Sequence, residues 1–356
     1  MIQTFRAAAI VVAFILSGTC SGFSQQAQSL ALFHDVHRAM GSEFSIELYA
    51  PNQETADQWM QLSFEEVDRI EALLSNYRPS SELSRISREA GSHPVTTDPE
   101  TFAFLQTAFS WSRRSDGAFD MTVGPLMRAW GFFYDHGRIP AEAELLALKK
   151  QTGWSNVHLD ASTRTVSFIN GTPMELDPGG IGKGYAVDRI VGLLREQHVS
   201  AALISAGSST IYAIGAPPDS PSGSRGWPIN IADPAHPGSK LSTVFLSDTS
   251  LSTSACTEKF FIKDGHRYCH ILDPHTMHPV DNMLQTTVIA PSATDSDALT
   301  KPTFIMGPEA SARPLESCPD TKAVIVSGTT ESPHYRAIHW PTPLHTEHQA
   351  KQEKRD

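Results

Sequence analysis

Residues 174–200, with the sequence MELDPGGIGKGYAVDRIVGLLREQHVS, contain the pattern that decides the fold. The pattern predicts a short apolar strand, a glycine-rich loop that starts at Asp177, and an amphipathic helix that begins near Lys183. Backbone N–H groups of such a loop can hold an anion together with the N-terminus of the helix, which suggests phosphate. The signal is weak by itself, because Asp177 replaces the first glycine of a Walker loop and Val187 replaces the last glycine of a dinucleotide-binding loop. A plain tight turn explains the loop equally well.

The segments on either side of this loop alternate between helix and strand. Upstream, the hydrophobic spacing predicts a strand from His34 and helices over residues 55–74 and 99–114. Downstream, residues 201–215 predict a buried strand, and the chain beyond them predicts mainly strands. These patterns therefore predict a chain with both helices and strands.

A hairpin is predicted around Asp264-Gly265, because this dipeptide between apolar runs is a strong signal for a two-residue turn. Such a turn places Phe260 opposite Cys269. On the same register Cys256 is four residues away from the position opposite Cys269, a separation of roughly 13 Å at about 3.4 Å per residue. Disulfide geometry does not span that distance. We therefore expect Cys256 and Cys269 to be free thiols.

Composition excludes several classes of protein. The chain has 356 residues, of which 40% are hydrophobic, and this supply of apolar side chains excludes wholesale disorder. It carries 28 Lys and Arg residues against 39 Asp and Glu residues, for a formal charge of -11. An acidic chain lacks the positive surface that covers a phosphate backbone, so nucleic acid is not an expected partner.

The N-terminal residues predict a signal peptide. Arg6 precedes an apolar run over residues 7–16, and small residues from Ser17 onward suit a cleavage site. The run is shorter than the about 20 residues that span a bilayer. Cys20 stands where a bacterial lipoprotein carries its lipid, although Ser17 replaces the leucine usual in such signals. We predict export to the periplasm or cell envelope, with an inner-membrane lipid anchor at Cys20 as an alternative.

The predicted organisation is a signal peptide over 1–29, one domain over 30–330 and a flexible C-terminal tail over 331–356.

Two clusters of polar residues could bind a metal. The stretch DGHRYCHILDPHTMHP contains His266, His270, His275 and His278, but it lacks the ligand spacing of a zinc site, and for His266 a solvated turn residue is the favoured interpretation. Asp297 and Thr300 are predicted near the start of a short helix, where hard oxygen ligands suit Mg²⁺. Asp297 alone would more often cap the helix.

The order of these features decides between the interpretations. From Met40 onward the chain resembles the ApbE family of FAD:protein FMN transferases, through the segments AMGSEFSIELY, LLSNYRPSSELSRIS, SDGAFDMTVGPLMRAWGF, LDPGGIGKGYAVDRI, ALISAGSSTIYAIG, LSTSACTEKFF, HILDPHTMHPV and SDALTKPTFIMG. The resemblance implies a compact α/β (α+β) fold with mixed β-sheets flanked by helices and an FAD cleft. It also implies an exported enzyme that cleaves FAD, attaches FMN through a phosphoester bond to Ser or Thr of an envelope flavoprotein, and releases AMP. The alternatives are a periplasmic FAD-binding homologue that has lost transfer, and an FAD pyrophosphatase.

The resemblance also implies roles for individual residues. His270 and Asp297 would be catalytic. The residues that would contact FAD are Met40, Tyr77, Ala118, Phe119, Asp120, Asp177, Lys183 and Ile271. The positions that would hold Mg²⁺ are Gly180, Asp297, Thr300 and Lys301.

The chain departs from the family pattern close to the expected phosphate site. Lys301 replaces a threonine expected to bind the metal, and other departures are Ser208-Ser209, Ala255 and Met277. An ammonium beside a divalent cation would repel it. Either Lys301 turns outward and Mg²⁺ binds weakly, or its ammonium occupies the place of the metal. Dependence on Mg²⁺ is therefore open.

Overall fold

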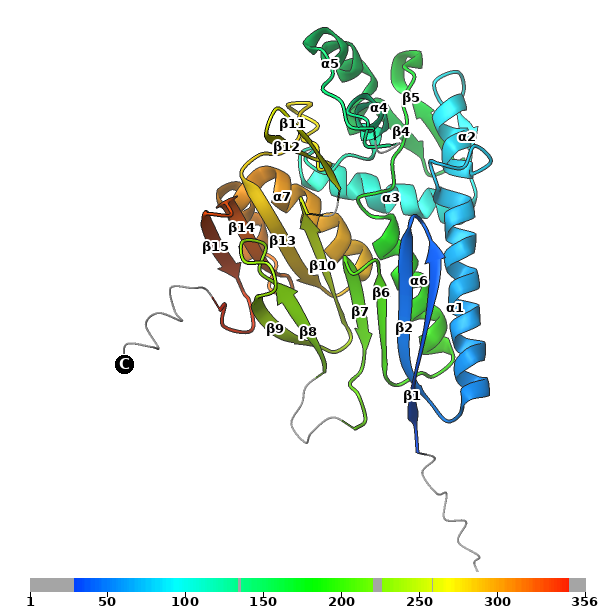
Figure 1. Ribbon diagram of the computed structural model, residues 1–356. Helices are drawn as coiled ribbons and strands as arrows, with labels where there is room; N and C mark the ends of the chain where they lie inside the picture. Colours follow the sequence, from blue (N-terminus) through cyan, green and yellow to red (C-terminus); the bar gives the residue numbers. More distant parts are fainter. Residues whose placement is uncertain (1–28, 134–135, 220–225, 258, 346–356) are drawn as a thin grey trace, which may run out of the picture.

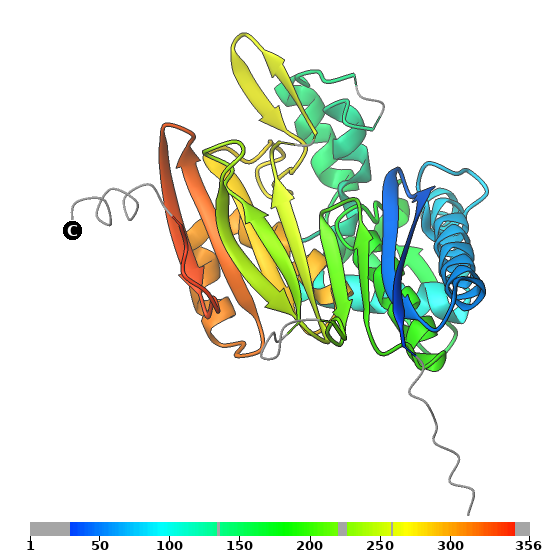
Figure 2. The ribbon, with the colours of Figure 1, turned by 60° about the horizontal axis from the view of Figure 1, so that its bottom comes forward.

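The main sheet has eight strands in the order β1-β2-β6-β7-β10-β13-β14-β15, and all neighbours are antiparallel (Figure 1). The computed structural model describes residues 29–133, 136–219, 226–257 and 259–345. The strands of this sheet are β1 (Ala31–Ala39), β2 (Ser42–Ala50), β6 (Ala202–Ala206), β7 (Thr210–Ile214), β10 (Thr249–Ala255), β13 (Met283–Ala290), β14 (Lys322–Thr329) and β15 (Ser332–Ile338). Figure 2 shows β1 and β15 at opposite edges of the sheet. Within the described ranges, no helix has the length and apolar character needed to cross a membrane.

Helices cover one face of this sheet and a hairpin covers the other (Figure 1). The helices are α1 (Gln53–Leu74), α6 (Gly182–Glu196) and α7 (Ala293–Glu316), and the hairpin consists of β8 (Trp227–Ala232) and β9 (Lys240–Leu246). Successive side chains of a strand point to opposite faces. In β13, Val288 shares a buried cluster with Phe304 of α7, whereas the adjacent Ile289 shares one with Val244 of β9. Both faces of the sheet are therefore buried at β13.

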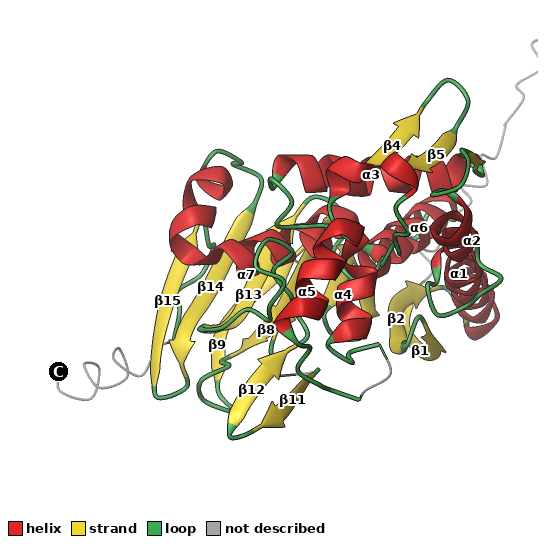
Figure 3. Cartoon of the chain, turned by 90° about the horizontal axis from the view of Figure 1, so that it is seen from above, coloured by secondary structure: helices red, strands yellow, loops and turns green. Residues whose placement is uncertain are grey.

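Smaller elements gather at one end of the sheet, and Figure 3 shows several of them from above. They are α2 (Glu82–Glu89), α3 (Pro99–Arg114), α4 (Gly124–Ala129), α5 (Glu142–Leu148), β3 (Val95–Thr96), β4 (Val157–Asp160), β5 (Thr165–Phe168), β11 (Phe260–Lys263) and β12 (His266–Cys269), with single turns of 3-10 helix at Met121–Val123, Lys149–Gln151, Trp154–Asn156 and Ile169–Gly171. Leu126 of α4 and Leu145 of α5 pack with Leu272 and Met277, which follow β12. This packing fixes the segment after β12 beside α4.

The glycine-rich loop leads into α6, which begins at Gly182 as predicted. The strand predicted before it is wrong, because residues 172–178 form neither strand nor helix. Their backbone bonds elsewhere: the Asp177 N–H donates to the carbonyl of Met121 at 2.7 Å. A glycine is required at Gly184, since a Cβ there would lie 2.2 Å from the carbonyl oxygen of Ala293. The first turns of α6 and α7 therefore lie in direct contact.

The prediction of free thiols at Cys256 and Cys269 is wrong. The two cysteines form a disulfide with their Cα atoms 5.2 Å apart. The predicted hairpin register is confirmed, since Phe260 faces Cys269. The error lies in the assumption of a continuous strand, because β10 ends at Ala255 and the chain turns before β11 begins. That turn brings Cys256 back to the hairpin.

The predicted C-terminal tail is wrong in its first part. β15 pairs with β14 along its whole length, from Thr329 opposite Ser332 to Ala323 opposite Ile338. Trp340 packs against the buried cluster under the β8–β9 hairpin. The polar composition that suggested a tail reflects an edge strand whose outer side chains meet solvent. Residues 346–356, and the predicted signal peptide up to residue 28 with Cys20, lie outside the described residues.

Candidate active site

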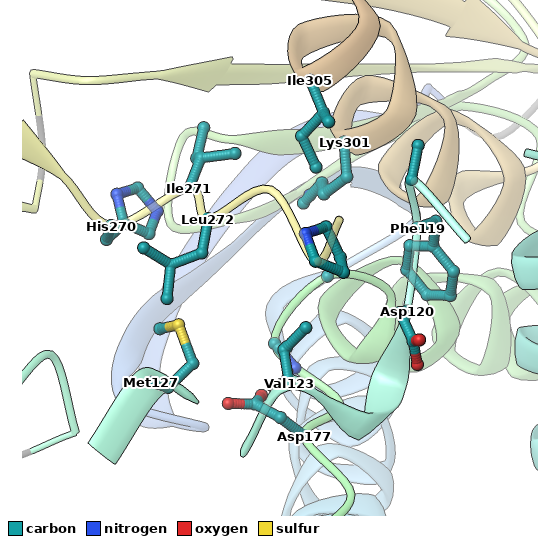
Figure 4. A pocket seen from close by; sticks show the side chains of 14 residues that line it. Phe119, Asp120, Val123, Met127, Asp177, His270, Ile271, Leu272, Lys301 and Ile305 are labelled. Carbon is teal, nitrogen blue, oxygen red and sulfur yellow. Dashed lines mark hydrogen bonds between the residues drawn. The ribbon is translucent and has the colours of Figure 1, made fainter. Parts of the chain in front are cut away.

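A pocket lies between the glycine-rich loop, the residues around Asp120, the segment after β12, and the middle of α7 (Figure 4). In Figure 4, the side chains of His270 and Leu272 lie across the pocket from Phe119. Its enclosed volume is about 130 Å³, which is smaller than a typical ligand pocket, so a dinucleotide has to extend beyond it. The lining residues are Ala118, Phe119, Asp120, Val123, Met127, Asp177, Gly179, Gly180, His270, Ile271, Leu272, Pro274, Lys301 and Ile305.

Most of the residues predicted from the family resemblance meet in this pocket. Those that line it are Ala118, Phe119, Asp120, Asp177, Gly180, His270, Ile271 and Lys301. They come from distant parts of the sequence, which the packing of α6 against α7 and of the β12 segment against α4 brings together. Asp297 and Thr300 lie directly behind the wall, in contact with Lys301.

Asp120 stabilises the part of the pocket wall that contains Phe119. Its carboxylate accepts hydrogen bonds from the backbone N–H and the hydroxyl of Thr122 at 2.8 and 2.7 Å, and from the Trp154 N–H at 2.8 Å. Burial raises the pKa of the Asp120 carboxyl, and these hydrogen bonds act in the opposite direction. Asp120 therefore fixes the local backbone as well as lining the pocket.

Asp177 forms another part of the wall, at the start of the glycine-rich loop. Its Oδ1 atom accepts the Gly179 N–H at 2.7 Å. Burial raises the pKa of Asp177, while that hydrogen bond lowers it. At Gly180, a Cβ would lie 3.0 Å from the Phe119 ring, so a larger residue would crowd the pocket. The loop thus lines the pocket with backbone atoms and one carboxyl group, and its glycines add no side chains that would fill the pocket.

His270 is held in one tautomer at the pocket. Its Nδ1 atom lies 2.9 Å from the carbonyl oxygen of Lys259, and a carbonyl only accepts, so Nδ1 carries the proton. Burial, assisted by the positive charges of Lys301, Lys259 and Lys183, lowers the pKa of His270 to about 4. The ring is therefore neutral at pH 7, with a lone pair on Nε2 that can accept a proton.

Lys301 forms a compact cluster with two predicted metal ligands. Its Nζ contacts the Asp297 carboxylate and lies 3.1 Å from both the Asp297 carbonyl oxygen and the Thr300 hydroxyl. The Asp297 residue is only 2% exposed. Gly180 lies beside the Lys301 stem, where a Cβ would be 3.5 Å from its Cγ. The four positions predicted for Mg²⁺ are thus adjacent in space.

These residues do not fit a divalent ion as they are arranged. The Thr300 hydroxyl donates to the Asp297 carbonyl and accepts from Ser254 and Lys301, which uses its hydrogen-bonding capacity. The Asp297 carboxylate is engaged by Lys301 and by the Gly184 N–H. In the described part of the chain, no three His, Cys, Asp or Glu side chains gather as metal ligands. The donor set suits an ammonium group.

Three predicted FAD contacts lie outside the pocket wall. Met40 lies beside the glycine-rich loop, with its Cε 3.4 Å from the position of a Cβ on Gly182. Tyr77 is 56% exposed and stacks on Phe133 with ring centroids 4.0 Å apart. The Lys183 ammonium contacts the Ser209 hydroxyl. These residues can contact FAD only where the ligand extends beyond the enclosed pocket.

The histidines considered for zinc do not meet. His266 lies near Asp281, His275 contacts the carbonyl of Asp116, and His278 lies near Glu142. Each of these three histidines belongs to a separate surface contact.

Sequence reasoning missed several apolar residues of the pocket, namely Val123, Met127, Leu272, Pro274 and Ile305. A helical spacing could have identified Ile305, because it follows Lys301 by one turn of α7 and so lies on the same side. Leu272 is next to a predicted contact, and Val123 and Pro274 are three residues from one, but apolar residues there predict core as readily as a ligand site.

Comparisons with known proteins agree with this geometry. The model of the ApbE family matches residues 40–325. An FAD:protein FMN transferase of Klebsiella pneumoniae is 33% identical over 290 residues, covering 81% of this chain and 87% of that protein. One from Treponema pallidum is 32% identical over 267 residues, covering 72% and 73%. The crystal structure of the ApbE protein from Thermotoga maritima has a TM-score of 0.78 at 28% identity, covering 86% of this chain and 97% of that one.

The fold and the pocket thus define a flavin-transferase type of α/β protein. The chain belongs to the ApbE family.

Proposed function

We propose that this protein is an FAD:protein FMN transferase. The observation that carries the proposal is His270, a neutral ring whose Nδ1 proton is committed to the Lys259 carbonyl and whose Nε2 is a base at the pocket. Relatives that cover most of this chain bear the same name. The acceptor is a Ser or Thr hydroxyl of an envelope protein.

The reaction is an in-line substitution at phosphorus. The acceptor oxygen forms a bond to the phosphorus of the FMN half of FAD, and the bond from that phosphorus to the bridging oxygen breaks. AMP leaves with the bridging oxygen, and Nε2 of His270 takes the proton of the acceptor hydroxyl. No oxidant or reductant is consumed.

Positive charge for the pyrophosphate is supplied by the chain itself in this proposal. Lys301, Lys259 and Lys183 are all close enough to His270 to lower its pKa. Fixed cations beside the pyrophosphate stabilise the charge that develops on the leaving AMP. Mg²⁺ is given no step, because the residues predicted to hold it do not fit it.

The test is a reaction of purified mature protein with FAD and an acceptor protein that carries a Ser or Thr site. Chromatography measures AMP and FMN, and mass spectrometry measures flavin on the acceptor. AMP together with labelled acceptor supports the proposal. AMP with free FMN would instead identify a pyrophosphatase, and intact bound FAD would identify a carrier; either result contradicts transfer. A His270→Asn variant, whose side-chain amide can still donate a hydrogen bond but has no basic nitrogen, should lose AMP release while it still binds FAD.

We also propose that the protein works outside the cytoplasm, in the periplasm or cell envelope. The pattern of residues 1–29 supports export, and the Cys256–Cys269 disulfide supports an oxidising compartment. Mass spectrometry of envelope proteins, from cells with and without this chain, would identify the acceptor by its FMN adduct. Recovery of the unprocessed chain from the cytoplasm would contradict export, and a lipid on Cys20 would be seen in the same experiment.

A further inference from the structure

The Lys301 side chain places an ammonium group among oxygen atoms of the residues that were predicted to bind Mg²⁺. Lys301 lies on α7 one turn after Asp297, and its side chain is 21% exposed where it reaches the pocket. Its ammonium has three oxygen partners: the Asp297 carboxylate, the Asp297 carbonyl and the Thr300 hydroxyl. An ammonium group has three N–H donors, which equals the number of these oxygen partners. We call the three oxygen atoms the cage of Lys301.

Two further hydrogen bonds hold oxygen atoms of this cage in place, and a bound ion would have to displace the groups that donate them. Ser254 donates to the Thr300 hydroxyl at 2.8 Å, and the Gly184 N–H donates to the second Asp297 oxygen at 3.0 Å. Ser254 belongs to β10 and Gly184 to the first turn of α6, so two further elements hold the position of these oxygens. A divalent ion would also meet the fixed positive charge of Lys301 at contact distance, and the two repel.

From this arrangement we infer that the Lys301 ammonium replaces the divalent cation, so that FAD binding and cleavage do not require Mg²⁺. The inference rests on the proposed function. Lys301 lies in the pocket wall and can exchange one of its 3.1 Å contacts for a phosphate oxygen of FAD, as a lysine point charge does in other phosphate sites. The opposite charges of Asp297 and Lys301 cancel each other. The net positive charge near the pyrophosphate therefore comes from Lys183 and Lys259.

The test measures Mg²⁺ directly as well as activity. Isothermal titration calorimetry of the metal-stripped mature protein with Mg²⁺ should show no binding at millimolar concentrations. FAD affinity and the rate of AMP release should be the same with EDTA as with Mg²⁺. The inference is overturned if the parent protein binds Mg²⁺ and EDTA stops AMP release.

Two variants at this position separate the roles of charge and space. Lys301→Thr removes the ammonium and supplies an oxygen ligand, so it should gain Mg²⁺ binding in calorimetry and release AMP only when Mg²⁺ is present. Lys301→Met keeps the volume of the stem and removes the charge, and it should lose about tenfold in FAD affinity without gaining Mg²⁺ binding, the loss expected for one charge-assisted hydrogen bond. If Lys301→Thr does not fold, the parent and Lys301→Met still decide the inference.

The matched control is Lys263→Thr, at an exposed lysine in β11 away from the pocket. It should behave as the parent in every measurement. If the parent releases no AMP under any condition, the proposed function fails, but calorimetry on the parent and on Lys301→Thr still shows whether the ammonium holds the place of the ion. Equal Mg²⁺ binding by those two proteins would overturn the inference.

Discussion

At the scale of single residues, the site depends on groups whose ordinary chemistry has been changed by their surroundings. His270 is the clearest case, because burial and three nearby lysines keep its ring neutral. Asp120 and Asp177 are the opposite case, since burial raises the pKa of both carboxyls. Burial thus lowers the pKa of the histidine and raises the pKa of the two carboxyls.

The first prediction concerns the pH dependence of the reaction. A base with a pKa of about 4 is already deprotonated in mildly acidic solution, so kcat/KM should stay level as the pH falls through 6.5 and should decline only near pH 4. Rates of AMP release across this range measure the acid limb. The His270→Asn variant should lose about 10²–10⁴-fold in rate, the usual contribution of general base catalysis. An acid limb centred near 6.5 would show that the ring titrates normally.

The second prediction concerns Tyr77, which is exposed and stacked on Phe133. If this ring pair receives part of the flavin, Tyr77→Ala should weaken FAD binding by about threefold to tenfold, the range expected for one aromatic stacking contact. Tyr77→Phe keeps the ring and serves as the matched control, with unchanged affinity. Flavin fluorescence titration measures both. Equal affinity in the alanine variant would remove Tyr77 from the binding site.

At the scale of elements, the short-range signals in the sequence were good predictors. Asp264-Gly265 predicted the hairpin and its register because a two-residue turn leaves few alternatives. The start of α6 followed from the glycine-rich loop. The disulfide was missed because it depends on how the chain turns between β10 and β11, and no local pattern predicted that turn. β15 was likewise missed, because the polar composition of this edge strand suggested a flexible tail.

The third prediction concerns this disulfide, which ties the end of β10 to the end of β12. Cys256→Ser/Cys269→Ser should lower the free energy of unfolding by about 3 kcal/mol, the value expected for closing a loop of this size. Denaturant unfolding of the double variant and the parent measures the change. FAD affinity should fall as well, because His270 directly follows Cys269.

The control for this prediction is Cys318→Ser, at a half-buried free cysteine on another part of the chain. This variant should unfold much like the parent. A double variant that matches the parent in both stability and FAD affinity would show that the hairpin holds its position without the covalent link.

At the scale of the whole molecule, the family resemblance predicted which segments would meet, and the physical patterns alone did not. Asp120, Asp177, His270 and Lys301 are far apart in the sequence, and each has an ordinary local explanation. Their meeting depends on the order of eight strands, including several crossovers, which hydrophobic periodicity does not specify. The orientation of Lys301 was also undecided from sequence, because the choice between solvent and Asp297 depends on the packing of α6 against α7.

The fourth prediction concerns the size of the folded domain. A chain that ends at Glu331 lacks β15 and the packing of Trp340, and it exposes β14 as a new edge with a buried apolar sequence. It should give little soluble protein or should aggregate, because such an edge pairs with other chains. A chain that ends at residue 345 keeps every described contact and serves as the control. Soluble yield and size-exclusion chromatography compare the two; equal behaviour would show that β15 is dispensable.

The Cys256–Cys269 disulfide also links the activity of the protein to an earlier step, the oxidation of these two cysteines. A reducing compartment keeps the two cysteines as thiols, so a newly made chain there can form its sheet but not the disulfide beside His270. The hairpin that presents the base is then held only by non-covalent packing. We expect full activity to appear after oxidation, so that the place where the chain is oxidised also determines when it begins to consume FAD.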